Sequence, residues 1–166
     1  MLKVTGSLII LVCGYFVGDY FKSSLTTKQN QLADMAKIIG IIEDEIGFLS
    51  CDYETIKEKL IATENLSSSN FIEIYKNQTA LPPPIQWRNA TENCNFIVAQ
   101  SEKDSFAEIG QIIGAYQKDV QLRRLAIIKK NLTLEREELL EYIKTHAKMY
   151  KSLSILIAVG ILIFIF

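Results

Sequence analysis

The residue types that could carry chemistry are few in this chain of 166 residues. It has one histidine, His146, and three cysteines, Cys13, Cys51 and Cys94. His146 stands among lysines near the C-terminal end, with no second histidine or carboxylate at the spacing of metal ligands. The cysteines show neither C-x-x-C spacing nor an even disulfide set. We therefore expect reduced structural cysteines and no metal site.

One carboxylate cluster, Glu43–Glu45, is dense enough to consider as an acid and base pair. Three consecutive helical residues point in three directions, so they cannot act together. Glu45 is the candidate of interest because it borders an apolar stripe, between Ile42 and Ile46. We interpret it as a rim carboxylate bonded to a neighbouring helix. No phosphate-binding loop, H-E-x-x-H or G-x-S-x-G motif is present, and we expect no catalytic residue, no cofactor and no enzymatic activity.

The elements that must position these residues are helical throughout. Apolar residues at alternating steps of three and four predict a helix over about 27–49 with one broad inward face. That face comprises Leu32, Met35, Ile39, Ile42, Ile46 and Leu49. A second helix is predicted after an Asp52 N-cap, and a third after Ser68 or Ser69. Their inward residues are Tyr53, Ile56, Leu60 and Ile61, then Phe71, Ile72, Ile74 and Tyr75.

A run of three prolines, Pro82–Pro84, predicts an extended turn that no helix crosses. A fourth helix is expected after it, with inward residues Ile85, Trp87, Ala90, Cys94 and Ile97, and a short fifth helix with Phe106, Ile109, Ile112 and Ile113. Trp87 is interpreted as a buried anchor of the bundle. The sequence therefore predicts an all-α protein, a bundle of about six helices.

The last helix is expected to be long because neither proline nor glycine interrupts residues 115–159. It would run on into the C-terminal apolar segment as a rigid lever. Its inward residues are predicted to be Val120, Leu122, Leu125, Ile128, Leu132, Leu139 and Ile143. The charged run at 135–138 interrupts this stripe and is typical of a solvated face.

Two glycine pairs with G-x-x-x-G spacing carry packing information. Gly14 and Gly18 lie in the N-terminal apolar segment, where such spacing lets helices approach closely, toward the other anchor or another subunit. Gly110 and Gly114 repeat the spacing in the fifth helix. Glycine there costs about 1 kcal/mol relative to alanine, so we expect close helix contact or a flexible joint.

Both ends of the chain are apolar, which predicts transmembrane helices flanking the bundle. About 18 helical residues span roughly 27 Å, close to the hydrocarbon thickness of a bilayer. We predict an N-terminal anchor over 1–21, a cytoplasmic helical domain over 22–150 and a C-terminal anchor over 151–166. The first segment could alternatively be processed as a signal peptide or acylated at Cys13, although no A-x-A-like cleavage site follows it. Lysines on the inner side of both segments favour a hairpin with both termini on the far side of the membrane.

Composition limits the partners. The formal net charge of -1 gives no basic surface for nucleic acid. The membrane is the expected partner, and the glycine pair in the first anchor allows a homo-oligomer.

The order of features along the whole chain resembles the stage III sporulation protein AB family. The features are Met1-Leu2-Lys3 entering an apolar segment, Glu45-Ile46 in the 42–49 helix, Gly110-x-x-x-Gly114 followed by Gln121, Glu135-Arg136-Glu137, and Tyr150-Lys151-Ser152-Leu153 entering the terminal apolar run. That family is similar to the cytoplasmic domain of inner-membrane platform proteins of type II secretion and type IV pili.

The resemblance implies a role in endospore formation, in the mother-cell membrane around the forespore. It implies a non-enzymatic platform between a cytosolic secretion-type ATPase and other stage III sporulation channel proteins. Candidate interaction or packing residues are then Glu45, Gly110, Gly114, Gln121, Gly14 and Gly18. The alternative is a membrane-tethered sensor or chaperone that binds a peptide or apolar ligand. That alternative needs a cavity lined by Phe71, Tyr75 and Trp87, whereas a platform predicts a filled core.

Overall fold

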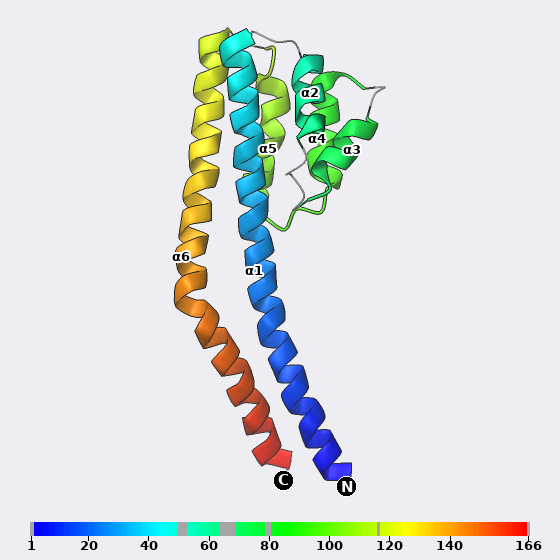
Figure 1. The fold of residues 1–166 in the computed structure, drawn as a ribbon, viewed down its shortest axis with the longest axis vertical. Helices are drawn as coiled ribbons and strands as arrows, with labels where there is room; N and C mark the ends of the chain where they lie inside the picture. The colour runs from blue at the N-terminus through cyan, green and yellow to red at the C-terminus, as the bar shows by residue number, and fades with distance from the viewer. Residues whose placement is uncertain (1, 50–52, 64–68, 79–80, 116, 166) are drawn as a thin grey trace. The chain divides into compact units, whose positions relative to one another are not determined.

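The computed structural model is helical wherever it describes regular secondary structure (Figure 1). It describes the backbone of residues 2–49, 53–63, 69–78, 81–115 and 117–165, and the side chains of residues 19–20, 22–48, 53–63, 69–78, 81–115, 117–146, 149, 152–153, 156–157 and 160. Within these residues there are six helices and no strand: α1 Leu2–Leu49, α2 Tyr53–Ala62, α3 Phe71–Asn77, α4 Pro83–Asn93, α5 Gln100–Ile112 and α6 Lys118–Ile165. The predicted all-α class is confirmed, as is the prediction of about six helices.

The chain divides into two compact units. Unit 1 comprises Met1–Thr27 and Glu137–Phe166, and unit 2 comprises Lys28–Arg136. In the part of the chain that the structure describes, we find no helical stretch with the length and apolar character needed to cross a bilayer. Most side chains of the two predicted anchors, 1–21 and 151–166, lie outside the described residues. The transmembrane helices therefore stay predictions.

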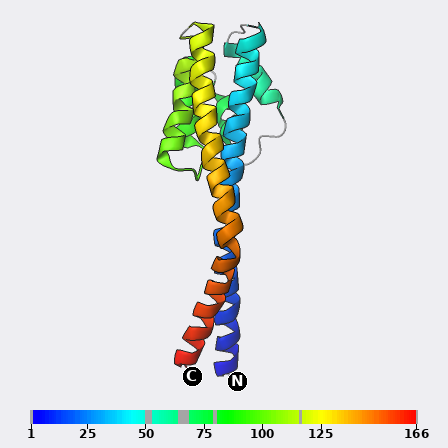
Figure 2. The same ribbon diagram turned by 90° about the vertical axis from the view of Figure 1, so that its left-hand side faces the viewer.

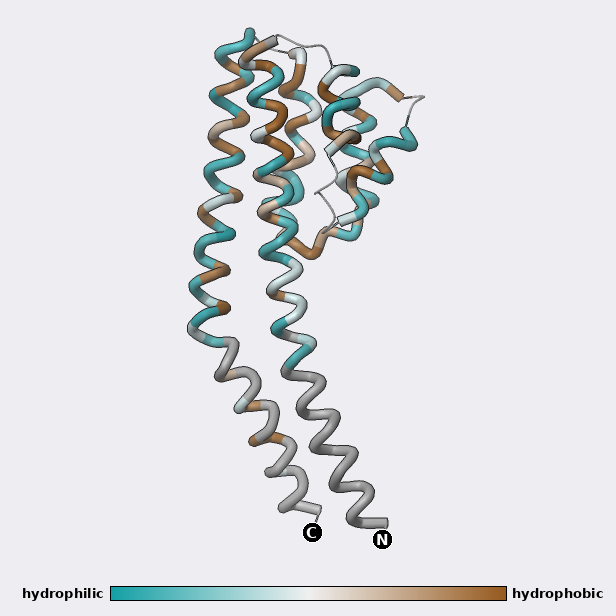
Figure 3. Tube along the Cα trace, viewed as in Figure 1, coloured by the Kyte–Doolittle hydropathy of each residue, from teal (hydrophilic) through white to brown (hydrophobic). Residues whose placement is uncertain are grey.

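The part of α1 in unit 2 supplies one side of the core. Leu32, Met35, Ile39 and Ile42 are each 0% exposed and Ile46 is 4% exposed. The predicted inward face is thus confirmed over these residues, because steps of three and four place them on one side of the helix. Figure 3 shows hydrophobic residues recurring along this part of α1 between hydrophilic ones. Leu49 lies outside the described side chains.

The rest of unit 2 packs around this face. Figures 1 and 2 show α2 to α5 gathered beside the 28–49 part of α1 and the 118–136 part of α6. An aromatic cluster fills the space among α3, α4 and α5, with Phe71, Tyr75, Trp87 and Phe106 all 0% exposed. Ring centroids lie 5.0 Å apart between Phe71 and Trp87 and 5.4 Å apart between Tyr75 and Trp87, in edge-to-face contact. The prediction that Trp87 anchors the bundle is confirmed.

The proline run is the first correction to the sequence analysis. Instead of remaining an extended turn, the chain enters α4 at Pro83, with Pro82 as the N-cap residue. The N–H groups in the first turn of a helix have no acceptor within the helix, so proline loses no hydrogen bond there. The fixed φ of proline also suits the first position of a helix, and Pro83 and Pro84 therefore start α4. The prediction that no helix crosses the run still holds, because α3 ends at Asn77 and α4 begins inside the run, at Pro83.

Three further expectations need correction. Ile85, Ile97 and Val120 were expected to face inward but are 46%, 46% and 42% exposed. The fourth helix ends at Asn93, because Cys94 takes an extended conformation, so Ile97 follows it in a loop. Ile85 lies on the first turn of α4, where only Gln86 and Trp87 turn inward. The sequence analysis assigned the apolar residues of α6 to one inward face, but they lie on two faces, and Val120 is on the exposed one.

Unit 1 contains the first part of α1 and the last part of α6. Both parts are helical over their described backbone. The whole of α6 is one helix from Lys118 to Ile165, and the absence of proline and glycine from residues 115–159 predicted such a long helix. His146 lies on this part of α6, with its ring stacked on Tyr142 at 4.3 Å between centroids. Its Nδ1 lies 3.1 Å from the Tyr142 carbonyl oxygen of the preceding turn.

Candidate interaction site

Glu45 is buried and paired. Its side chain is 6% exposed, and an oxygen lies 2.7 Å from Lys59 Nζ on α2, whose side chain is 59% exposed. The ion pair joins the end of α1 to α2 and keeps the carboxylate charge compensated at the edge of the core. The structure therefore places Glu45 as the bonded rim carboxylate that the sequence analysis described.

Gly110 lies where α5 crosses α4. A Cβ added there would be 2.6 Å from Trp87 Cβ and 3.1 Å from the Pro84 carbonyl oxygen. Neither the tryptophan Cβ nor the backbone oxygen is the flexible end of a side chain, so no larger residue fits without moving a helix. Of the two roles expected for this glycine pair, close helix contact applies at Gly110.

Gly114 and Gln121 form the joint between α5 and α6. Gly114 has a φ of +78°, which favours glycine, and no heavy atom within 4 Å of the position of a Cβ. Its N–H donates a hydrogen bond of 3.1 Å to Gln121 Oε1, in the first turns of α6. Gln121 is 9% exposed. The structure therefore brings the candidate residues Gly114 and Gln121 together. Gly14 and Gly18 are not among the residues whose surroundings the structure describes.

A buried lysine forms a second polar cluster that the sequence analysis did not single out. Lys57 on α2 is 6% exposed. Its Nζ donates to the Gln78 carbonyl oxygen at 2.8 Å and to Gln86 Oε1 at 2.6 Å, and lies 5.2 Å from the centre of the Tyr75 ring. Gln86 Nε2 in turn donates to the Leu81 carbonyl oxygen at 2.6 Å. The sequence signal was a lysine directly beside the inward-facing Ile56, at a position where helix periodicity allows burial.

Two tyrosines lie beside this cluster. The Tyr53 hydroxyl donates to the Pro83 carbonyl oxygen at 2.7 Å, which ties α2 to the start of α4. Burial raises the pKa of Tyr53 to about 12, and it also raises the pKa of Tyr75. Both phenols are therefore neutral at physiological pH and act as structural groups.

A third cluster fixes the loop between α4 and α5. Gln31 on α1 donates to the Asn95 carbonyl oxygen at 3.1 Å and accepts from the Ile97 N–H at 2.8 Å. Asn70 and Asn95 exchange reciprocal bonds, each side-chain oxygen accepting from the other backbone N–H at 2.8 and 3.1 Å. The start of α3, this loop and α1 are thereby held together.

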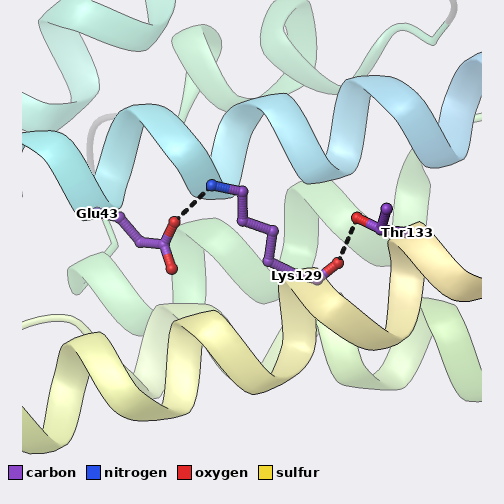
Figure 4. Close-up of polar contacts among 3 residues, drawn as sticks. All are labelled: Glu43, Lys129 and Thr133. Carbon is purple, nitrogen blue, oxygen red and sulfur yellow. Dashed lines mark hydrogen bonds and ion pairs between the residues drawn. The ribbon is translucent and has the colours of Figure 1, made fainter.

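The part of α6 in unit 2 is tied to α1 by lysines. Lys129 Nζ lies 2.7 Å from Glu43 Oε2, and Thr133 donates to the Lys129 carbonyl oxygen at 2.8 Å (Figure 4). At the start of α6, Lys118 donates to the Gly47 carbonyl oxygen, one of the last carbonyls of α1. Within unit 2 the two helices are thus held together by one ion pair and one hydrogen bond.

These contacts describe how a helical unit is held together. Among the described residues, no three His, Cys, Asp or Glu side chains come together as metal ligands. Cys94 is buried and free, and burial raises the pKa of its thiol. The polar side chains described above bond to one another or to backbone groups across helix boundaries. Over the described residues, the class of protein that the fold and contacts define is an all-helical protein whose first and last helices, α1 and α6, have 48 residues each.

The family follows from comparison with known proteins. The model of the stage III sporulation protein AB family matches residues 3–166. Because this match covers nearly the whole chain, the chain belongs to that family, and the resemblance noted in the sequence is confirmed. Comparisons with curated proteins and with solved structures find no match.

Proposed function

We propose that this chain is a non-enzymatic membrane platform of a secretion-like channel complex in endospore formation. In this proposal it couples a cytosolic secretion-type ATPase to the membrane components of the complex. It would sit in the mother-cell membrane around the forespore, anchored by residues 1–21 and 151–166, with its helical domain in the cytoplasm. The observation that carries the proposal is membership of the stage III sporulation protein AB family across residues 3–166.

The mechanism proposed is mechanical. A partner that docks on unit 2 would displace helices that are bonded to α6, and α6 would carry the displacement along its length. Three contacts inside unit 2 support this coupling: Lys129 to Glu43, Arg124 to Glu108 at 3.6 Å, and Gln121 to the Gly114 N–H. The unbroken α6 from Lys118 to Ile165 supports it as well, because a continuous helix resists bending better than a jointed one.

The packing of the core favours this proposal over a ligand-binding sensor or chaperone. Such a protein would need a cavity lined by Phe71, Tyr75 and Trp87. These three rings contact one another instead, with centroids 5.0 to 5.7 Å apart and no exposed area. A core filled in this way suits a scaffold that binds partners on its outer surface.

The first test concerns the side of the membrane on which unit 2 lies. A single cysteine is introduced at Leu81, which is 41% exposed, in full-length protein lacking its three native cysteines. Intact cells are then treated with a membrane-impermeant thiol reagent, and a cysteine on an externally exposed protein serves as the labelling control. Labelling only after permeabilisation supports a cytoplasmic unit 2, whereas labelling of intact cells excludes access by a cytosolic ATPase.

The second test concerns the partner. Full-length chain in detergent is mixed with the secretion-type ATPase of the same sporulation complex, and ATP turnover and co-purification are measured. We expect a stable complex, a changed ATPase rate and no turnover by the chain alone. Robust ATP hydrolysis by the chain alone would exclude the non-enzymatic adaptor.

A further inference from the structure

We draw no further inference here: the strongest candidate, the outer face of α6 with the exposed residues Val120, Ile127 and Leu134, carries none because nothing in the described part of the chain shows what covers it.

Discussion

Gly110 of α5 lies directly against Trp87 of α4, so close that an added Cβ would be 2.6 Å from the tryptophan Cβ and 2.9 Å from its Cγ. One turn earlier on α5, the Phe106 carbonyl oxygen accepts a hydrogen bond of 2.7 Å from the Trp87 indole N–H. A single tryptophan therefore fixes both the distance and the register between the two helices.

Gly110→Ala is expected to lower the free energy of unfolding by about 2 kcal/mol, the usual range for forcing extra volume into a packed core. This loss outweighs the gain of about 1 kcal/mol that alanine brings to a helix interior. Urea denaturation followed by circular dichroism measures it. Gly47→Ala is the matched control, because no atom lies within 4 Å of a Cβ there, and it should leave stability unchanged or raise it. Equal effects of the two variants would contradict the close-contact role.

The helices of this fold could be predicted where apolar periodicity was strong. The inward face of α1 and the burial of Trp87 and Phe106 follow from residue type and spacing. The start of α4 could not be predicted in the same way, because proline both breaks a helix and begins one, and the distinction depends on which turn it occupies. Val120 was misplaced because a helix with two apolar faces looks from sequence like one broad face.

Lys57→Met is expected to lower the free energy of unfolding by about 1 to 3 kcal/mol. The substitution keeps much of the side-chain volume but leaves the Gln78 carbonyl oxygen and Gln86 Oε1 without their buried donor. Lys76→Met makes the same chemical change at an exposed position of α3, where an effect within about 0.5 kcal/mol is expected. Chemical denaturation of both variants decides whether the buried amine bonds are needed for stability.

Gly114→Ala is expected to cost about 1 to 2 kcal/mol for a different reason. No atom is close enough to clash with an added Cβ, so the cost comes only from the φ of +78°. Gly114→Asn should cost less, since asparagine tolerates this conformation better than alanine. We expect the thermal midpoint to be highest for the protein with Gly114, lower for Gly114→Asn and lowest for Gly114→Ala. Identical losses for Asn and Ala would show that the backbone conformation is not the cause.

The candidate residues also differ in how far sequence could reveal them. Glu45 was placed correctly because its neighbours define which side of α1 faces inward. Gln121 and Gly114 form a contact between two elements, and no periodicity within either element shows that their ends meet. The Lys57 cluster was missed for the same reason, because its partners Gln78 and Gln86 lie on other elements.

The stability of the fold should fall in alkaline solution because of Tyr53 and Tyr75. Burial raises the pKa of Tyr53 from 10.0 to about 12, so between these values the unfolded chain releases a proton that the folded chain retains. The unfolded state is then favoured as pH rises, by up to about 1.4 kcal/mol per pH unit for each such group. Tyr53→Phe should make the decline between pH 10 and about 12 shallower. Urea midpoints across this range measure it, and an unchanged slope would contradict burial as the cause.

The ion pair between Lys129 and Glu43 should couple α6 to α1 by about 0.5 to 1 kcal/mol, measured by a double-mutant cycle of Glu43→Gln and Lys129→Met. The side chains are 41% and 18% exposed, so solvent screening keeps the value small, and added salt should reduce it further. Gly40 makes room for the lysine, because a Cβ there would lie 3.3 Å from its Nζ. Repeating the cycle in a Gly40→Leu background should bring the coupling near zero, since the larger side chain displaces the amine. Coupling that persists in this background would show that Lys129 reaches Glu43 without the space beside Gly40.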